Sequence, residues 1–216
     1  MSDQSSVVTA EHFQYVAAHT RPEDAFLRDL KQAATAAGIP PIWVAPEQAS
    51  FMQVLLKAAR ARVVVEIGTL CGYSAINMAR ALPAGGQVLT IELDTARADF
   101  TEQWVARSDV AGKVVVHRGK GMDVLPGFAS DLADAAFLDA DKGSYPQYLK
   151  ECMRIVRRGG LIMVDNAFAF GELFATTPID REVGAIRAFN DHMAGVAGLQ
   201  GVIVPIGDGL WVAVRE

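Results

Sequence analysis

Phe137-Leu138-Asp139-Ala140-Asp141-Lys142 and Leu161-Ile162-Met163-Val164-Asp165-Asn166 share one pattern, a short apolar run that ends in acidic or amide side chains. A strand buried on both faces of a parallel sheet reads as such a run. Ligand sites in open α/β sheets lie just beyond the carboxyl ends of the strands. If these two strands are neighbours, Asp139 and Asp165 lie ~5 Å apart, the spacing between adjacent strands.

Two carboxylates at that distance repel each other unless one is protonated or a cation lies between them. Asn166 adds a neutral oxygen ligand beside Asp165. Ligands that are all oxygen favour a hard divalent ion, with Mg²⁺ as the first choice and Mn²⁺ or Ca²⁺ as alternatives. We therefore interpret the two strand ends as a metal site that lies next to a cofactor site.

The chain around these strands alternates apolar runs with helical segments from residue 62 onward. The other predicted strands are 63–68, 87–92, 113–116, 202–204 and 210–214, and alanines from 133 lead into Phe137. A helix at 145–156 is expected to be closed by residues 157–160, and a late helix is expected at about 179–193. Gly207-Asp208-Gly209 reads as a hairpin turn. Five βα units followed by an antiparallel hairpin predict an α/β fold, a mostly parallel sheet with helices on both faces.

Three further helices, at 10–19, 23–37 and 46–60, precede the first strand. We expect a single domain, residues 1–216, with residues 1–60 as an N-terminal helical cap and 61–216 as the core. The cap covers the active site, forms a dimer surface or closes the core, and the sequence does not choose between these roles.

Composition excludes several classes of protein. An apolar fraction of 51% over 216 residues argues against disorder. The net charge of −5 does not suggest a nucleic-acid-binding protein, although a local basic patch would not show in that average. We find no apolar run long enough to span a membrane and no secretory signal at residues 1–6, so we expect a cytoplasmic protein without membrane contact. Cys71 and Cys152 are too few for a disulfide framework, and the four histidines have no metal-ligand spacing.

The loop Gly68-Thr69-Leu70-Cys71-Gly72 follows a predicted buried strand and opens a helix. Glycine lets a ligand approach the backbone, and a helix N-terminus attracts negative charge. The spacing is not Gly-x-Gly-x-x-Gly, which argues against a nicotinamide oxidoreductase. Glu92 ends the next strand and is placed to accept hydrogen bonds from ribose hydroxyls, although a structural turn with a solvated Glu92 is the alternative. Glu66 lies within an apolar strand, where a buried carboxylate needs a partner such as the ammonium group of a ligand.

Four segments taken together resemble one protein family: Glu66-Ile-Gly-Thr-Leu-Cys-Gly-Tyr-Ser74, Ile91-Glu-Leu-Asp94, Leu138-Asp-Ala-Asp-Lys142 and Val164-Asp-Asn166. They are similar to the cation-dependent, S-adenosylmethionine-using O-methyltransferases, the group of catechol and caffeoyl-CoA O-methyltransferases and their small bacterial relatives. The resemblance implies a Rossmann-like class I methyltransferase fold, with a seven-stranded sheet whose last strand is antiparallel. It also implies a homodimer, with the N-terminal helices as a contact.

The resemblance further implies roles for individual residues. Asp139, Asp165 and Asn166 would be the metal ligands, and Lys142 would be the general base or phenolate stabiliser, with Asp139 as the second catalytic residue. The implied contacts of S-adenosylmethionine are Val44 with Ala45 at its carboxylate, Glu66, Gly68, Tyr73 and Ser74 at its methionine part, Glu92 at the ribose, Gly121 and Met122 at the adenine, and Asp139.

Two segments depart from the family. Gly119-Lys-Gly-Met122 stands where many relatives have small or polar residues. The loop after Asn166 lacks the tryptophan common in bacterial and plant members. Phe168, Phe170 and Phe174 in that loop are either core or part of a substrate pocket. Because this loop usually shapes the pocket, the sequence does not name the substrate.

The hypothesis that follows is methylation of a vicinal diphenol, a phenolic small molecule. Mg²⁺ with three protein ligands has positions left for both substrate oxygens, and Lys142 would take the proton. One alternative is a hydroxylated nucleoside in transfer RNA, for which Arg21, Arg28 and Lys31 are the candidate basic patch. The other is a non-catalytic cofactor-binding protein. Asp141 either helps to shape the site or caps the helix that starts near Ser144.

Overall fold

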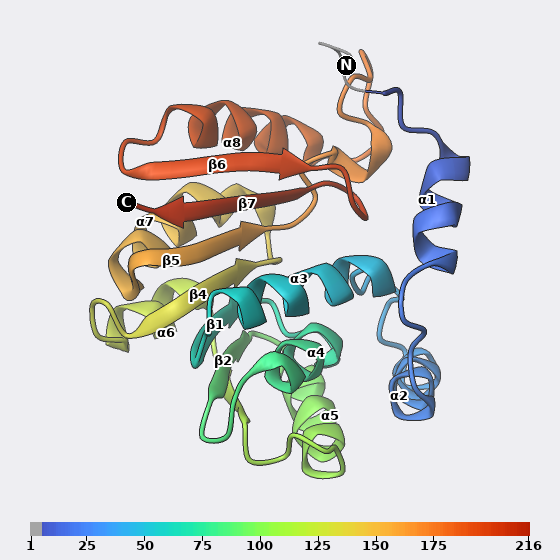
Figure 1. Ribbon diagram of the computed structural model, residues 1–216, viewed down its shortest axis with the longest axis vertical. Helices are drawn as coiled ribbons and strands as arrows, with labels where there is room; N and C mark the ends of the chain where they lie inside the picture. Colours follow the sequence, from blue (N-terminus) through green and yellow to red (C-terminus); the bar gives the residue numbers. More distant parts are fainter. Residues whose placement is uncertain (1–5) are drawn as a thin grey trace.

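A computed structural model describes residues 6–216, so most of the stretch in which no secretory signal is expected lies outside the described residues. The centre of the fold is a seven-stranded sheet with the order β3-β2-β1-β4-β5-β7-β6 (Figure 1). The strands are β1 (Val63–Ile67), β2 (Gln87–Glu92), β3 (Val114–Arg118), β4 (Ala133–Leu138), β5 (Val156–Val164), β6 (Leu199–Val204) and β7 (Leu210–Arg215).

The pairing of the strands confirms the predicted fold class. Strands β3, β2, β1, β4 and β5 run parallel to one another, and β7 runs antiparallel to both β5 and β6. The sheet is therefore mostly parallel with its last strand antiparallel, as in Rossmann-like methyltransferases. Strands β4 and β5 are neighbours, with Leu138 opposite Val164, so their carboxyl ends meet.

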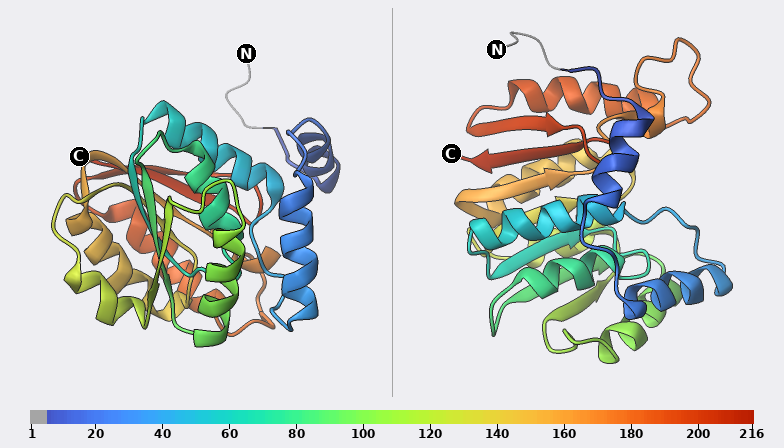
Figure 2. Two further views of the ribbon diagram at one scale, coloured as in Figure 1. Left: turned by 90° about the horizontal axis from the view of Figure 1, so that it is seen from below. Right: turned by 45° about the vertical axis from the view of Figure 1, so that its right-hand side comes forward.

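Helices surround the sheet on both faces (Figures 1 and 2). They are α1 (Ala10–Ala18), α2 (Ala25–Ala36), α3 (Pro46–Ala58), α4 (Tyr73–Ala81), α5 (Thr95–Ala106), α6 (Gly121–Val124), α7 (Tyr145–Ile155) and α8 (Val183–Gly195). Three single 3₁₀ turns complete the set: η1 (Leu125–Gly127), η2 (Lys142–Ser144) and η3 (Ala169–Gly171).

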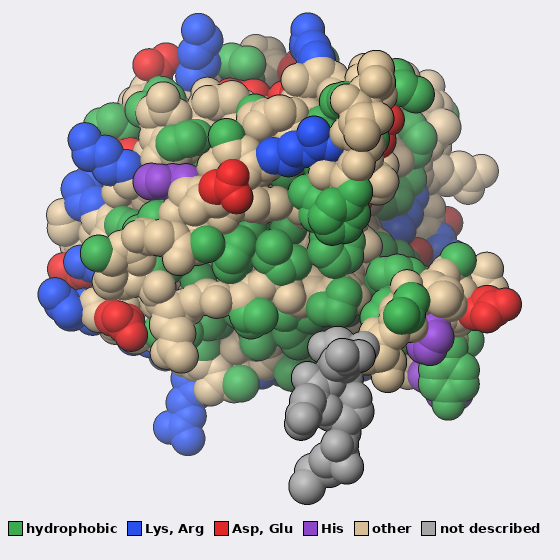
Figure 3. All heavy atoms as spheres, turned by 90° about the horizontal axis from the view of Figure 1, so that it is seen from above, with side chains coloured by type: hydrophobic (Ala, Val, Ile, Leu, Met, Phe, Trp, Pro, Cys, Tyr) green, Lys and Arg blue, Asp and Glu red, His purple; other side chains and the backbone are tan. Residues whose placement is uncertain are grey.

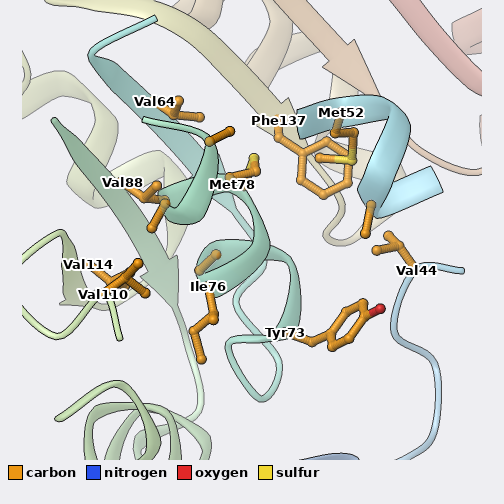
Figure 4. Packing of buried hydrophobic residues seen from close by; sticks show 14 of the residues in the cluster. Val44, Met52, Val64, Tyr73, Ile76, Met78, Val88, Val110, Val114 and Phe137 are labelled. Atoms are coloured by element: carbon orange, nitrogen blue, oxygen red, sulfur yellow. The ribbon is translucent and has the colours of Figure 1, made fainter. Parts of the chain in front are cut away.

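Alternate residues of the central strands point to opposite faces, and each face has its own apolar core. Val64 and Phe137 pack on one face with residues of α2, α3, α4 and α5, and Figure 4 shows Phe137 beside Met52 of α3. The adjacent residues Val65 and Leu138 pack on the other face with residues of α7 and α8. Burial on both faces explains why these strands read as continuous apolar runs.

The N-terminal helices differ in how they join the body. Asp24 caps α2 by accepting from the Leu27 backbone N–H at 2.9 Å, and Leu30 of α2 is fully buried. Helix α3 begins with Pro46, a favourable first residue, and belongs to the same apolar cluster as β1 and β4. Helix α1 buries none of its residues and stands beside the body of the molecule (Figure 2).

Strand β5 starts earlier than the sequence predicts. Residues 157–160, expected to close the preceding helix, lie inside β5, because Val156 is buried and pairs with Ala133. The register shifts between Ala133 and Ala135, and the Arg157 guanidinium bonds the Asp134 carboxylate at 2.7 Å. Arg157 therefore contacts the irregular part of the strand pairing, and Arg158 donates to the backbone carbonyl of Glu216 at 2.8 Å, so neither residue closes the helix.

The last helix starts later than predicted, at Val183. Ile179 is 95% exposed and lies in the preceding loop. The Glu172 carboxylate accepts the backbone N–H groups of Ile179 and Asp180, so this segment is held as a loop by side-chain bonds. Strand β6 also begins earlier than predicted, at Leu199.

Between residues 6 and 216, the helices are too short or too polar to cross a lipid bilayer. Both cysteines, Cys71 and Cys152, are buried and not joined by a disulfide.

Candidate active site

Asp139 and Asp165 lie side by side where β4 and β5 end. The Asp139 backbone N–H donates to the carbonyl of Ile67 at 2.9 Å, and the Asp165 N–H donates to the carbonyl of Leu138 at 3.0 Å. Each residue thus extends the parallel pairing by one step past its strand. The structure therefore brings together the two carboxylates that the sequence predicts to be neighbours.

Lys142 lies in the 3₁₀ turn that follows Asp139, and its side chain is 5% exposed. Its Nζ lies 3.0 Å from Asp139 Oδ1 and donates to the Tyr145 hydroxyl at 2.7 Å. Burial and the charges of Asp139 and Asp165 hold the pKa of Tyr145 well above its ordinary value, so its hydroxyl stays protonated. The ammonium group is therefore fixed between a carboxylate and a neutral hydroxyl.

Asp165 is buried, and burial is the main reason that its pKa rises to about 7. The charge of Asp139 raises this pKa further, whereas a hydrogen bond from Gln48 and the charge of Lys142 lower it. Gln48 Nε2 donates to Asp165 Oδ1 at 2.7 Å. An ionised Asp165 is thus costly in the folded protein unless a further positive charge lies nearby.

Asn166 has a left-handed backbone, with φ 64°, which asparagine tolerates better than most residues. Its Nδ2 donates to Asp208 Oδ2 at 3.1 Å, so the carbonyl oxygen Oδ1 lies at the opposite end of the amide, turned away from Asp208. Asp208 also accepts from the backbone N–H groups of Phe170 and Gly171, at 2.8 and 3.2 Å. The predicted hairpin turn thereby orients the amide.

This donor set fits a hard divalent cation. Among residues 6–216 there is no group of three or more His, Cys, Asp or Glu side chains arranged to hold a metal. The site offers two carboxylates and one amide oxygen, Asp139, Asp165 and Asn166, which suit Mg²⁺ better than a softer metal. Burial and the charge of Asp139 raise the pKa of Asp165, so a cation at this place would favour its ionised form.

Gly68 brings the cofactor loop against the end of β4. Its φ is +98°, and a Cβ on it would lie 1.8 Å from the carbonyl oxygen of Asp139. Only glycine fits this position. Gly72, with φ +82°, is the N-cap of α4, and its own Cβ would meet Thr101 at 2.7 Å. The expected cofactor loop and the candidate cation ligand are therefore in direct contact.

Glu92 is 6% exposed, so it is not the solvated side chain of the alternative interpretation. Its two carboxylate oxygens accept the backbone N–H groups of Leu70 and Asp94, each at 2.9 Å. Glu92 thus ties the loop between β1 and α4 to the end of β2. This is the strand end at which an acid is placed for a ribose.

Glu66 is fully buried in β1 and accepts hydrogen bonds from the Ser74 and Thr90 hydroxyls, each at 2.5 Å. Thr90 in turn lies 2.5 Å from the hydroxyl of Thr69. Burial raises the pKa of Glu66 to about 8, against the effect of these hydrogen bonds. The sequence predicts the ammonium group of a ligand as the partner of this carboxylate, whereas the structure shows hydroxyls of the protein itself in that role, including Ser74.

The remaining predicted cofactor residues are Val44, Tyr73, Gly121 and Met122. Tyr73 is buried and directed toward Val44, which is also buried (Figure 4). Gly121 starts α6, and a Cβ there would lie 2.7 Å from the ring of Tyr148. Met122 beside it is 38% exposed and so accessible to a ligand.

The structure narrows two alternatives that the sequence leaves open, for Asp141 and for the loop after Asn166. The Asp141 carboxylate accepts from the Tyr148 hydroxyl at 2.8 Å and makes no capping bond to the following turn. In the loop after Asn166, Phe168 packs against Gly209, whereas Phe170 and Phe174 are 44% and 92% exposed. The exposed rings are available to a ligand and do not belong to the core.

Sequence reasoning did not identify Gln48 or Asp208 as site residues. Gln48 lies on the buried face of α3 next to Ala49, and a polar residue on an apolar face was a usable signal. Asp208 was recognised only as part of a turn. Both reach the site from segments remote in sequence, 117 and 42 residues away from their partners.

Comparison with known proteins agrees with the geometry. The family described as O-methyltransferase matches residues 17–216. A catechol O-methyltransferase from Niastella koreensis is 34% identical over 197 residues, which is 90% of this chain and 87% of the relative. An O-methyltransferase from Bacillus cereus, solved in complex with SAH, has a TM-score of 0.85 at 32% identity, covering 94% of this chain and 96% of its own. TomG from Streptomyces achromogenes, an O-methyltransferase involved in tomaymycin synthesis and solved with SAM, has a TM-score of 0.83 at 29% identity, covering 95% and 96%. With a family match over most of its length and a relative above 30% identity, this chain belongs to the O-methyltransferase family.

Proposed function

We propose that this enzyme transfers a methyl group from S-adenosylmethionine to one hydroxyl of a vicinal diphenol and that the reaction requires a divalent cation, with Mg²⁺ as the first choice and Mn²⁺ or Ca²⁺ as alternatives. The observation that carries the proposal is the contact between Gly68 and Asp139. The backbone of Gly68, in the expected cofactor loop, approaches the main-chain carbonyl of Asp139, and the carboxylate of Asp139 is one of the proposed oxygen donors and pairs with the buried Lys142. The SAH and SAM bound in two solved relatives and the catechol activity named for another support the cofactor and the substrate class.

Asp139, Asp165 and Asn166 would hold the cation between the ends of β4 and β5. A divalent cation at this place would lower the pKa of a bound phenolic hydroxyl and orient its oxygen. The Gln48 and Asp208 bonds keep two of these three side chains in one orientation. The protein thus supplies a rigid set of ligands whose net charge matches a divalent ion.

S-adenosylmethionine carries an activated methyl group on its sulfonium, so the protein mainly has to align the two reactants. Gly68, Gly72 and the Glu92 bonds shape the loop on which the methionine and ribose parts would lie. Val44 lies beside Tyr73, the first residue of the helix that this loop opens (Figure 4). This glycine-dependent loop would therefore fix where the methyl donor lies relative to Asp139.

Lys142 is the proposed general base. A lysine accepts a proton only as a neutral amine, and a nearby cation favours that form. Its Nζ lies 3.0 Å from Oδ1 of Asp139, and Asp139 is itself a proposed ligand of the cation. The Tyr145 hydroxyl accepts from Nζ and keeps it directed toward the strand ends.

The other two functions have less support. Of the candidate basic patch for transfer RNA, Lys31 pairs with Glu23 at 2.6 Å and Arg28 bonds the Glu23 backbone carbonyl. Arg21 lines a polar cavity together with Glu23 and Asp24, so this region carries both signs of charge. A non-catalytic role is disfavoured because Asp139, Lys142, Asp165 and Asn166 are all present and lie together at the ends of β4 and β5.

The test is methyl transfer from S-adenosylmethionine to a panel of vicinal diphenols, measured with Mg²⁺, without added metal and with a chelator. We expect methylation that a chelator abolishes and Mg²⁺ restores. Asp139→Asn should lose activity, whereas Asp141→Asn, a neighbouring exposed carboxylate, should keep it. Methylation that is insensitive to the chelator would remove the cation from the mechanism. Cofactor binding without methylation of any diphenol would refute the substrate class.

We also propose that the enzyme is a homodimer with α1 in the contact. Helix α1 buries no residue within the monomer, and Tyr15 and Val16 on it are 65% and 41% exposed. Seen from above, α1 projects from the body, and hydrophobic side chains also gather on the face over the β6 edge of the sheet (Figure 3). Sedimentation of the native protein and of Tyr15→Glu tests this, because only the native protein should sediment as a dimer.

A cytoplasmic location is proposed on the state of the cysteines. Cys71 and Cys152 are buried and unpaired, which is usual for proteins of a reducing compartment. Fractionation of cells that produce the protein checks this, and recovery in the membrane or exported fraction would contradict it.

A further inference from the structure

Gln48 is a polar side chain in the first turn of an otherwise apolar helix face. It is 1% exposed, and its helix α3 packs against the sheet through Ala49 and Met52. A buried amide is tolerated only when its polar atoms find partners. Its Nε2 donates to Asp165 Oδ1 at 2.7 Å, across 117 residues of sequence.

The other end of the Gln48 amide lies against the turn between β6 and β7. A Cβ on Gly207 would come 1.9 Å from Gln48 Oε1, and Gly207 has a φ of +55°. The amide is therefore wedged between this turn and Asp165. Because Oε1 faces the turn, the donor Nε2 must face the carboxylate.

The same turn also orients the next residue of the proposed cation site. Asp208, directly after Gly207, accepts from Asn166 Nδ2 at 3.1 Å. Asp165 and Asn166 are thus held from outside β5, one by α3 and the other by the turn that α3 touches. Neither hydrogen bond comes from β5, the strand that Asp165 and Asn166 directly follow.

We propose that Gln48 is a positioning residue for the cation site, an inference that rests on the proposed function. It holds one oxygen of Asp165 and so fixes the rotation of the carboxylate, and as a neutral donor it stabilises the charge without adding another. Because Gln48 closely follows Val44 in sequence, the N-terminal segment contributes both to the cofactor side and to the cation side of the active site.

The test is a titration of the full-length protein with Mn²⁺, in which electron paramagnetic resonance measures the bound and free metal. This measurement requires no turnover. Gln48→Met keeps the length of the side chain but removes the donor, and we expect ~10- to 100-fold weaker Mn²⁺ binding, the usual effect of losing a group that orients a ligand. Gln53→Met is the matched control. Gln53 lies on the same helix, and its Nε2 donates to Asn77 Oδ1 at 2.9 Å, away from Asp165.

Kinetics separate positioning from a general structural role. In Gln48→Met, the Mg²⁺ concentration for half-maximal activity should rise by the same factor, while kcat at saturating Mg²⁺ stays close to the native value. A merely structural loss would lower kcat at every Mg²⁺ concentration. Thermal unfolding of each variant shows whether it is folded.

Gly207→Ala provides a second variant if Gln48→Met does not fold. It keeps the glutamine but displaces its amide, because the new Cβ would occupy the space of Oε1, and it too should weaken Mn²⁺ binding. If the native protein binds Mn²⁺ and Gln48→Met binds it equally well, the role of Gln48 is refuted and the proposed function stands. If the native protein binds no Mn²⁺, both are refuted.

Discussion

Asp165→Asn should make the cation-free protein more stable at pH 8 while it removes cation-dependent activity. In the folded protein the pKa of Asp165 is about 7, against an ordinary value of 3.8, because the carboxylate is buried beside Asp139. At pH 8 the group is ionised in both the folded and the unfolded state. At about 1.4 kcal/mol for each pH unit, the raised pKa costs the folded protein ~4 kcal/mol.

The sign and the pH window follow from the raised pKa. The protonated Asp165 contributes to the free energy of unfolding, and this contribution is fully present below pH 3.8 and is lost as the pH rises through about 7. Asparagine has nearly the same shape, never ionises and can still accept the Gln48 hydrogen bond. The advantage of Asp165→Asn should therefore be largest at pH 8 and should shrink to ~1–2 kcal/mol at pH 5.

Urea unfolding in the presence of a chelator measures this difference at both pH values. Saturating Mg²⁺ should stabilise the native protein and not Asp165→Asn, since a ligand that binds only the folded state adds to its stability. Asp141→Asn is the control, because Asp141 is exposed and is not one of the proposed cation ligands. Equal or lower stability of Asp165→Asn at pH 8 in chelator would refute the reasoning that an ionised Asp165 is costly in the folded protein.

Three more substitutions test other parts of the site. Lys142→Met should lower kcat by at least ~100-fold without changing the Kd of S-adenosylmethionine. Steady-state kinetics would measure kcat and calorimetry would measure the Kd. An unchanged kcat would exclude Lys142 as the base. Gly68→Ala should destabilise the protein by at least ~3 kcal/mol in urea unfolding, because its Cβ would lie 1.8 Å from Asp139 O at a positive φ. Gly38→Ala is the control: it also has a positive φ but no atom within 4 Å of its Cβ, so it should cost only ~1–2 kcal/mol. The pKa of Glu66 is raised from 4.5 to about 8, so the folded native protein loses stability as the pH rises through that range and Glu66 ionises. Glu66→Gln should therefore flatten the dependence of Tm on pH. Curves of Tm against pH that run parallel for the native protein and the variant would contradict this.

Much of the site could be predicted because it depends on strand ends. The acids after Leu138 and Val164 follow buried runs, and parallel strands end at the same edge of the sheet, so their proximity follows from the topology. The boundaries that were wrong lie where side-chain bonds override local propensity. Asp134 holds Arg157 in a strand, and Glu172 holds Ile179 in a loop.

The sequence by itself determined the alternation of strands and helices, the mostly parallel sheet and the acids that line its carboxyl edge. These features are local, because burial on both faces of a strand and the period of a helix are written in consecutive residues. Only the tertiary structure decided what surrounds those acids. Gln48 on α3 and Asp208 in the last turn hold Asp165 and Asn166 through contacts between residues far apart in sequence. Such contacts depend on how α3 and the β6–β7 turn pack together, and no local pattern in the chain encodes that packing.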